Sequence, residues 1–182
     1  MLPGIKAAPD FRQSVASLHV QFGIPADYAE RRQLPLCEEA AELVSIGADL
    51  LGREQRLAPR AAAAWQRMQA AAEREGVPLT VVSAFRSVEY QAALIKRKLD
   101  RGMAIGDVLK INAAPGYSEH HTGRALDLTT TDSQPLEVAF ETTRAYAWLC
   151  QHAGEYGFKL SYPRGNIHGI NYEPWHWAFQ ES

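Results

Sequence analysis

The sequence predicts an α+β domain in which helices pack on a small, mostly antiparallel sheet. Strong helix formers run without a break over 61–75 and favour a long helix with one apolar face. Two segments of strand length follow. Residues 79–83 are rich in β-branched side chains, and in 124–129 leucines occupy alternate positions. Two more short strands, 158–160 and 175–179, flank a glycine-rich hairpin region near the C-terminus. Helices interspersed with such short strands are typical of a sheet covered by helices.

The first fifty residues contain one clear element. Apolar residues spaced by three and four predict a helix over 11–22, with Asp10 as its cap and a glycine and a proline at its end. Residues 26–37 are expected to form a loop, and 38–47 fits a short helix or an extended edge strand. Glycines on both sides of Asp49 predict a turn or hairpin there.

The remaining elements connect the strands. Pro59 suits the first turn of the long helix, and Gly76 occupies its stop position. Ser87 or a neighbour begins a helix that leaves the second strand-sized run, and a minor helix over 106–111 leads into a loop. A further helix is expected over 137–155, between the central strand and the C-terminal strands.

Composition excludes several classes of protein. The 182 residues are 46% hydrophobic and 22% charged with a formal net charge of -2, so no basic field for nucleic acid or acidic lipid is expected. The N-terminus has no apolar core and no later run reaches membrane-spanning length, which predicts a cytoplasmic protein, or a periplasmic one if a leader has been removed. Cys37 and Cys150 form no CxxC pair, exclude a cysteine-rich metal site, and are expected to be buried.

Two segments far apart in the chain carry candidate metal ligands. His120 and Asp127 lie in the first segment and His176 in the second, and two histidines with one carboxylate suit a catalytic zinc ion with an open position for water. The seven-residue gap between the first two ligands suits a loop ligand followed by a strand ligand, and Gly123 allows the turn between them. The sequence therefore suggests a zinc site in which Asp127 points from the sheet toward the metal.

A carboxylate precedes the last candidate ligand. Glu173 lies three residues before His176, and Pro174 between them excludes an ordinary helix interior. We expect Glu173 beside the metal-bound water, as a general base that later protonates the leaving amine. Trp175 and Trp177 are expected to wall the substrate pocket.

Spacing alone leaves alternatives open. Single histidines and aspartates are structural far more often than they are ligands, and His121 competes with His120 for the metal by spacing. His19, His152 and His168 have no neighbours of ligand type and receive no role. These residues by themselves fit a zinc hydrolase and a purely structural arrangement about equally well.

The pattern of motifs resembles the VanY type of zinc D-alanyl-D-alanine carboxypeptidase. The resemblance covers roughly residues 55–180 and extends to the wider superfamily of lysostaphin-like peptidases and the hedgehog signalling domain. Several motifs in the same order carry it: Ser118-x-His120-x-x-Gly123-x-Ala125-x-Asp127, Glu173-x-x-His176, Ser83-Ala-Phe-Arg86-Ser with Tyr90-Gln91, Tyr156-Gly-Phe158 and Tyr162-Pro163. The resemblance implies a hedgehog/D-Ala-D-Ala-peptidase-like fold and one zinc ion per chain.

The same resemblance implies roles for individual residues. It makes His120, Asp127 and His176 the ligands and Glu173 the base, and it leaves His121 a supporting role. It gives Arg86 the task of binding the scissile carbonyl and stabilising the oxyanion, which is worth about 3–4 kcal/mol for a good donor. It makes Gln91 and Ser118 candidates to hold the terminal carboxylate of the substrate. Trp175, expected at the pocket wall from its position, is a third candidate for contact with the substrate.

The expected function follows from these roles. We expect residues 55–182 to form one zinc carboxypeptidase domain, with residues 1–54 as an N-terminal extension packed on it. The expected reaction removes C-terminal D-alanine from peptidoglycan stem peptides or muropeptides, at an L,D or a D,D bond. The alternatives are an endopeptidase or D,D-dipeptidase of the same superfamily, or a zinc-containing binding module without activity. Neither nucleic acid nor a membrane span is expected.

Overall fold

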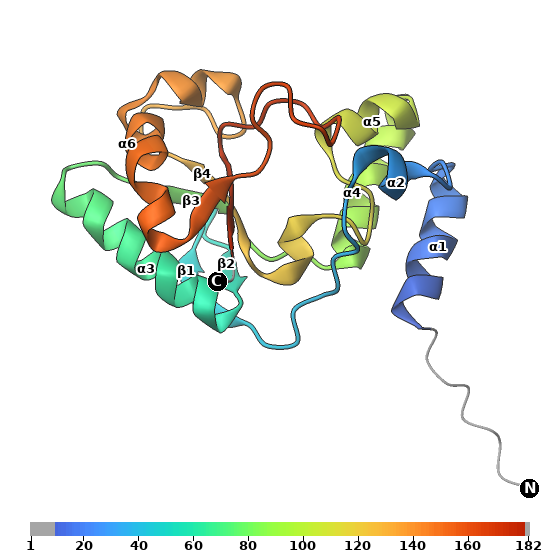
Figure 1. Ribbon diagram of the computed structural model, residues 1–182, viewed down its shortest axis with the longest axis horizontal. Coiled ribbons are helices and arrows are strands. Elements are labelled where there is room, and N and C mark those ends of the chain that lie inside the picture. Colours follow the sequence, from blue (N-terminus) through green and yellow to red (C-terminus); the bar gives the residue numbers. More distant parts are fainter. Residues whose placement is uncertain (1–9, 181–182) are drawn as a thin grey trace, which may run out of the picture.

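The computed structural model describes residues 10–180, which form an α+β fold (Figure 1). Strands and helices alternate irregularly along the chain. The helices are α1 Phe11–Phe22, α2 Tyr28–Arg32, α3 Pro59–Arg74, α4 Val88–Asp100, α5 Ile105–Ile111 and α6 Arg144–His152, with 3-10 turns η1 Glu119–Thr122, η2 Val138–Thr142 and η3 Ala153–Tyr156. The strands are β1 Val44–Ala48, β2 Glu54–Leu57, β3 Thr80–Ser83, β4 Ala125–Thr129, β5 Phe158–Leu160 and β6 His176–Phe179.

Two antiparallel sheets confirm the predicted fold class. The main sheet has the strand order β3-β4-β6-β5, and β1 and β2 form a separate hairpin. In the main sheet β4 lies between β3 and β6, with Ser83 opposite Asp127 on one side and His176 opposite Asp127 on the other. The register therefore brings a strand residue of the first motif beside the last histidine of the chain.

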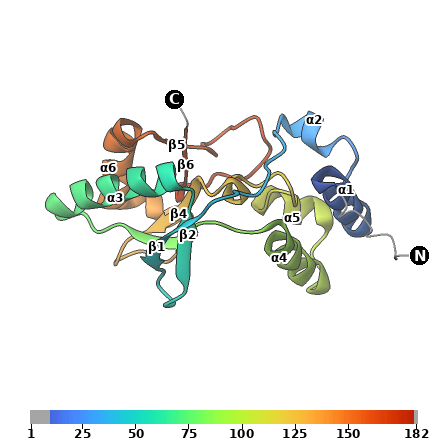
Figure 2. The ribbon, with the colours of Figure 1, turned by 90° about the horizontal axis from the view of Figure 1, so that it is seen from below.

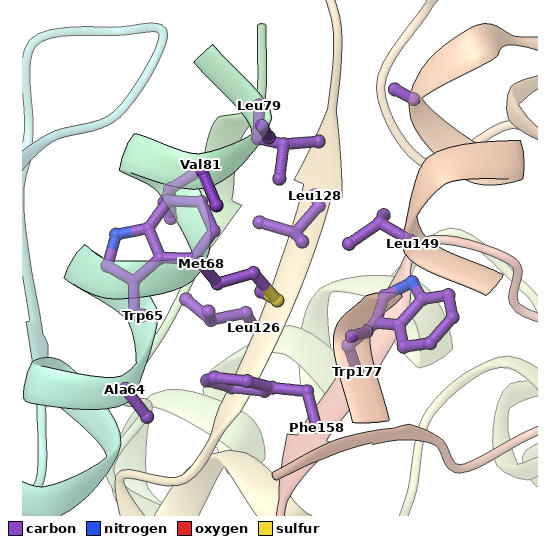
Figure 3. Close-up of a cluster of buried hydrophobic side chains, with 14 of the residues drawn as sticks. Ala64, Trp65, Met68, Leu79, Val81, Leu126, Leu128, Leu149, Phe158 and Trp177 are labelled. Carbon is purple, nitrogen blue, oxygen red and sulfur yellow. The ribbon is translucent and has the colours of Figure 1, made fainter. Parts of the chain in front are cut away.

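The larger hydrophobic core joins the main sheet to α3 and α6. Figure 3 shows Trp65 and Met68 of α3 facing Leu126 of β4. Trp177 of β6 belongs to the same core and is 4% exposed, so the expectation that it walls the substrate pocket is wrong. Side chains alternate along a strand, and a residue next to His176 therefore points to the opposite face of the sheet.

A second, smaller core is formed by residues of α1, α2, α5 and nearby loops, and these helices lie away from the main sheet (Figures 1 and 2). It includes Tyr28 of α2 together with Leu109 of α5 and Ile170 of the connection between β5 and β6. Two hydrogen bonds continue this contact along the N-terminal segment, because Cys37 N–H donates to Gly116 O at 2.7 Å and Ala40 N–H to His121 O at 2.9 Å. Residues 10–43 thus lie against the segment that carries the first motif, whereas residues 1–9 of the expected extension lie outside the described residues.

Some local expectations differ from the structure. The expected loop at 26–37 contains α2, and the undecided stretch 38–47 contains the start of β1. The expected helix over 137–155 is divided into η2, α6 and η3, because Thr143 is extended and caps α6, with its Oγ1 accepting from Tyr146 N–H at 3.1 Å. Of the two free cysteines, only one is buried, and the expectation for Cys150 is wrong.

Across residues 10–180, none of the helices combines the length and the apolar character needed to cross a membrane.

Candidate active site

The candidate metal ligands meet at the end of the main sheet. Asp127 on β4 and His176 on β6 are register partners, and η1 brings His120 to the same place. Gly123 ends η1 in the left-handed region with φ 66°, and an added Cβ would lie 2.8 Å from the backbone nitrogen of Ala58. The glycine is therefore required both by the turn and by the close approach of the preceding chain.

These three side chains form a compact group of possible ligands. Among the described residues, the ligand atoms of His120, Asp127 and His176 all lie within 4.8 Å of one another, and all three residues are buried. His120 Nε2 is 3.2 Å from Asp127 Oδ2, and His176 Nδ1 is 3.0 Å from Asp127 Oδ1. His120 Nε2 is buried without a hydrogen-bond partner, which fits a nitrogen that serves as a metal ligand. The donor set is that of a catalytic zinc site.

The two histidines are oriented by different partners. His120 Nδ1–H donates to the carbonyl oxygen of Ala84, so that Nε2 faces the group. His176 Nε2–H donates to Glu119 Oε2 at 2.8 Å, so that Nδ1 faces the group. Burial lowers the pKa of His120 to about 4, whereas for His176 the carboxylates of Asp127 and Glu119 outweigh burial and raise the pKa to about 10. The surrounding charge therefore differs between the two candidate ligands.

The carboxylate of Asp127 is held ionised. Burial opposes ionisation, but the charges and hydrogen bonds of His120 and His176 and the charge of Arg86 lower its pKa well below the usual value. An ionised carboxylate is the form that binds a metal ion.

Glu173 lies beside this group without belonging to it. Its Oε2 is 3.9 Å from His176 Nδ1, and its side chain is 13% exposed. Burial raises the pKa of Glu173 to about 7, while the charge of His176 opposes that shift. A carboxylate with such a pKa near a candidate metal can accept and return a proton, which is the task of a general acid/base.

Arg86 reaches the group from the connection between β3 and α4. Its Nη2 is 3.2 Å from Asp127 Oδ2, and its Nη1 donates to Gln91 Oε1 at 3.2 Å. Its Nε is buried and unpaired, and the side chain is 15% exposed. The guanidinium thus lies beside the candidate ligands and still has an N–H group free to donate a hydrogen bond.

Arg86, Glu173 and the two histidines line a small cavity of about 30 Å³. Gln91 and Ser118, both predicted to touch the substrate, line it. Gln91 is also engaged within the protein, because its Nε2–H donates to Ala113 O at 2.8 Å while its Oε1 holds Arg86. The lining residues are Arg86, Gln91, Ile111, Asn112, Ala113, Ser118, His120, Tyr162, Ile170, Glu173 and His176.

Other predicted residues lie elsewhere. His121 is fully engaged, because its Nδ1–H donates to Arg86 O at 2.6 Å and its Nε2 accepts from Gly116 N–H at 3.2 Å, which removes it from competition as a ligand. Trp175 is partly buried and packs against the larger core rather than on the small cavity, so its contact with substrate stays a prediction.

Sequence reasoning missed two polar residues at the site. Glu119 contacts His176, and Asn112 lines the small cavity with a buried Oδ1 that has no hydrogen-bond partner. The only sequence signal for Glu119 is its position between two motif residues. Asn112 carries no signal, because it belongs to no motif and lies at the end of a minor helix.

The family model and the relatives found by comparison with known proteins point to the same family. Residues 54–182 match the family model of VanY, described as D-alanyl-D-alanine carboxypeptidase. The chain is 28% identical over 183 residues to YodJ of Bacillus subtilis, covering 95% of this chain and 62% of that protein. It is 31% identical over 129 residues to the bifunctional D-Ala-D-Ala dipeptidase and D-Ala-D-Ala carboxypeptidase VanXYC of Enterococcus gallinarum, covering 68% of this chain and 66% of that protein. The chain thus spans a little under two thirds of the length of these relatives.

Solved structures agree with the sequence match. The structure of the LdcB LD-carboxypeptidase, which was determined to explain peptidoglycan recognition, superposes with a TM-score of 0.71 and 30% identity, covering 80% of this chain and 71% of that one. A variant of the vancomycin-resistance D,D-pentapeptidase VanY in complex with Zn(II) superposes with a TM-score of 0.62 and 26% identity, covering 80% and 82%.

Proposed function

Since this chain belongs to the VanY family of D-alanyl-D-alanine carboxypeptidases, we propose that it is a zinc carboxypeptidase that removes C-terminal D-alanine from peptidoglycan stem peptides or muropeptides. One observation carries the proposal: three buried ligand-type side chains cluster together, and two of them, the histidines, line one cavity with Glu173 and Arg86.

The chain would hold one zinc ion through His120 Nε2, the carboxylate of Asp127 and His176 Nδ1. A zinc ion in such a site supplies Lewis-acid polarisation and lowers the pKa of water. Side chains of the protein carry out the proton transfer, the stabilisation of the oxyanion and the binding of the substrate.

Glu173 takes the proton from the attacking water and later returns it to the amino group of the departing D-alanine. Its raised pKa of about 7 supports both steps, because the proton can be accepted and released near neutral pH. The burial of Glu173 also limits the access of bulk water during the transfer.

Arg86 donates hydrogen bonds to the scissile carbonyl oxygen as negative charge develops there. Gln91 holds the guanidinium in place through its Oε1, and this bracing supports a positioning role besides the predicted contact with substrate. Ser118, which is buried and lines the cavity, is proposed to bind the terminal carboxylate of the substrate.

The choice between L,D and D,D bonds is also a proposal. We favour the L,D bond of a tetrapeptide stem, because LdcB, an LD-carboxypeptidase, superposes with a TM-score of 0.71. The scores of a second L,D-carboxypeptidase, DacB, and of the D,D-pentapeptidase are 0.57 and 0.62, so the product assay decides between the two bonds. The cytoplasmic location expected from the sequence stays a prediction.

The test is an assay of products. The zinc-loaded protein is incubated separately with a tetrapeptide stem, a pentapeptide stem and free D-Ala-D-Ala, and mass spectrometry identifies the products. Release of a single D-alanine from a stem is the expected outcome, with the tetrapeptide cleaved faster. Cleavage of free D-Ala-D-Ala would add a dipeptidase activity, as the name of VanXYC describes for that relative. No release from any stem by zinc-loaded protein would contradict the proposal.

A further inference from the structure

Glu119 and the candidate metal position lie on opposite sides of the imidazole of His176. Glu119 Oε2 is 2.8 Å from Nε2, while Asp127 Oδ1 is 3.0 Å from Nδ1 on the other edge of the ring. His176 itself is buried and is 3% exposed. The carboxylate of Glu119 therefore touches a candidate ligand but cannot bind the same ion.

We propose that Glu119 is a positioning residue of the metal centre, which fixes the tautomer and orientation of His176 by accepting a hydrogen bond from Nε2. A neutral imidazole carries one proton, and a proton held on Nε2 leaves the lone pair of Nδ1 directed at the metal. A carboxylate partner also makes the imidazole a more basic ligand. This inference rests on the proposed zinc site.

The other histidine provides an internal contrast. His120 is oriented by a neutral backbone carbonyl, that of Ala84, which no side-chain substitution removes. His176 is oriented by the charged side chain of Glu119. A substitution of Glu119 can therefore remove this hydrogen-bond partner without changing any of the candidate ligands. Removal of Glu119 is expected to weaken one ligand and leave the other two in place.

The surroundings of Glu119 favour a role at His176 over a role in the core. Its side chain is 31% exposed and lines a cavity of about 310 Å³, which is distinct from the small catalytic cavity. Tyr162 and Ser161 line the same larger cavity. Small anions can reach this position through the larger cavity.

The test measures zinc affinity rather than turnover. The 182-residue wild type, Glu119→Ala and Glu119→Gln are titrated against a competing chromophoric chelator at fixed pH. Glu119→Ala is expected to bind zinc about 10- to 100-fold more weakly, the usual effect of losing such a partner. Glu119→Gln retains an oxygen that accepts from Nε2–H but loses the charge, so its affinity should lie between the other two.

Two further measurements separate positioning from folding. Formate is expected to restore part of the zinc affinity of Glu119→Ala, because it can occupy the vacated side of His176, and it should leave wild type unchanged. Replacement of zinc by cobalt(II) should give visible spectra that differ between wild type and Glu119→Ala. Glu155→Ala is the matched control, because it removes an exposed carboxylate 3.1 Å from His152, remote from the ligands.

The zinc affinities distinguish a failure of the role inferred for Glu119 from a failure of the proposed function. Zinc affinities of Glu119→Ala and Glu119→Gln equal to that of wild type would overturn the inference, and if Glu119→Ala does not fold, Glu119→Gln alone decides. A wild-type protein without affinity for zinc would contradict the proposed function together with the role of Glu119. A zinc-binding wild type with unchanged variants would contradict only the latter.

Discussion

The sheet side and the loop side of the site are held in different ways. On the sheet side, Asp127 and His176 lie on adjacent paired strands, and β4 is flanked by strands on both sides. On the loop side, Arg86 and Glu173 come from the connections that precede α4 and β6. Their placement depends on hydrogen bonds from distant parts of the chain, such as Phe85 N–H to Arg56 O at 3.0 Å.

We expect this difference to separate metal binding from catalysis. Strand register fixes Asp127 and His176 by many backbone contacts, whereas each loop residue depends on a few side-chain contacts. Substitutions on the sheet side are therefore expected to remove the metal, and those on the loop side to leave a metal-loaded but slower enzyme. Four substitutions test this division, in decreasing order of expected effect.

The largest effect is expected from Asp127→Asn. The substitution removes the charged ligand and the partner of Arg86, so zinc affinity and carboxypeptidase activity should both be lost. Zinc content and product release measure the two effects, and wild type treated with a chelator should behave in the same way. Asp132→Asn, an exposed change in the turn after β4, is the control and should retain both. Full activity in Asp127→Asn would disprove the assignment of the ligands.

Glu173→Gln should separate the two sides. The amide cannot accept the proton of the attacking water, and loss of a general base costs about 10²- to 10⁴-fold in rate. Zinc content should stay at the wild-type level, because Glu173 Oε2 is 3.9 Å from His176 Nδ1 and outside the ligand group. Metal analysis and kcat on the same preparation check both statements. Loss of zinc together with activity would place Glu173 on the metal instead.

Arg86→Lys is expected to have a smaller effect on the same side. Lysine keeps the charge but loses the planar fork that reaches both Asp127 and Gln91. If Arg86 stabilises the developing oxyanion, kcat should fall by about 10²- to 10³-fold while KM changes little. Arg56→Lys, in an exposed pair with Glu54, is the matched control and should leave kcat unchanged. A change confined to KM would assign Arg86 to ground-state binding.

The sequence predicted the strands of the main sheet better than the helical stretch at 137–155. Asp127 and His176 could be named because a spaced motif and its resemblance to a family specify them, and their strands were expected from short local patterns. The break at Thr143 was missed because the periodicity of apolar residues continues through it, while the cap depends on one side-chain hydrogen bond. Local patterns report periodicity and not such single contacts.

Contacts between distant segments explain the other misses. His120 and His121 are indistinguishable by spacing, and only their partners, Ala84 and Arg86 on another segment, decide which one is a candidate ligand. The role inferred for Glu119 depends on a residue 57 positions later that reaches it through the register of β6. Trp177 was misplaced because the face of a strand depends on what packs against each side.

The smallest of the four effects is expected from Arg32→Ala, outside the region matched by the family model. Arg32 Nη1 donates to Leu109 O at 2.8 Å, Gly169 O at 2.9 Å and His168 O at 3.2 Å, and so ties α2 and α5 to the connection that carries Glu173. Hydrogen bonds from a charged group are worth about 1.5–3 kcal/mol, part of which water replaces here. We expect a loss of about 1–2 kcal/mol in unfolding free energy and a several-fold lower kcat, with zinc content unchanged.

Denaturant titration measures the unfolding free energy, and steady-state kinetics measure kcat. The control is Arg31→Ala, which removes an exposed pair with Asp27 and should leave both quantities at wild-type values. Loss of zinc in Arg32→Ala would break the division between the two sides, because the loop side would then also determine metal binding.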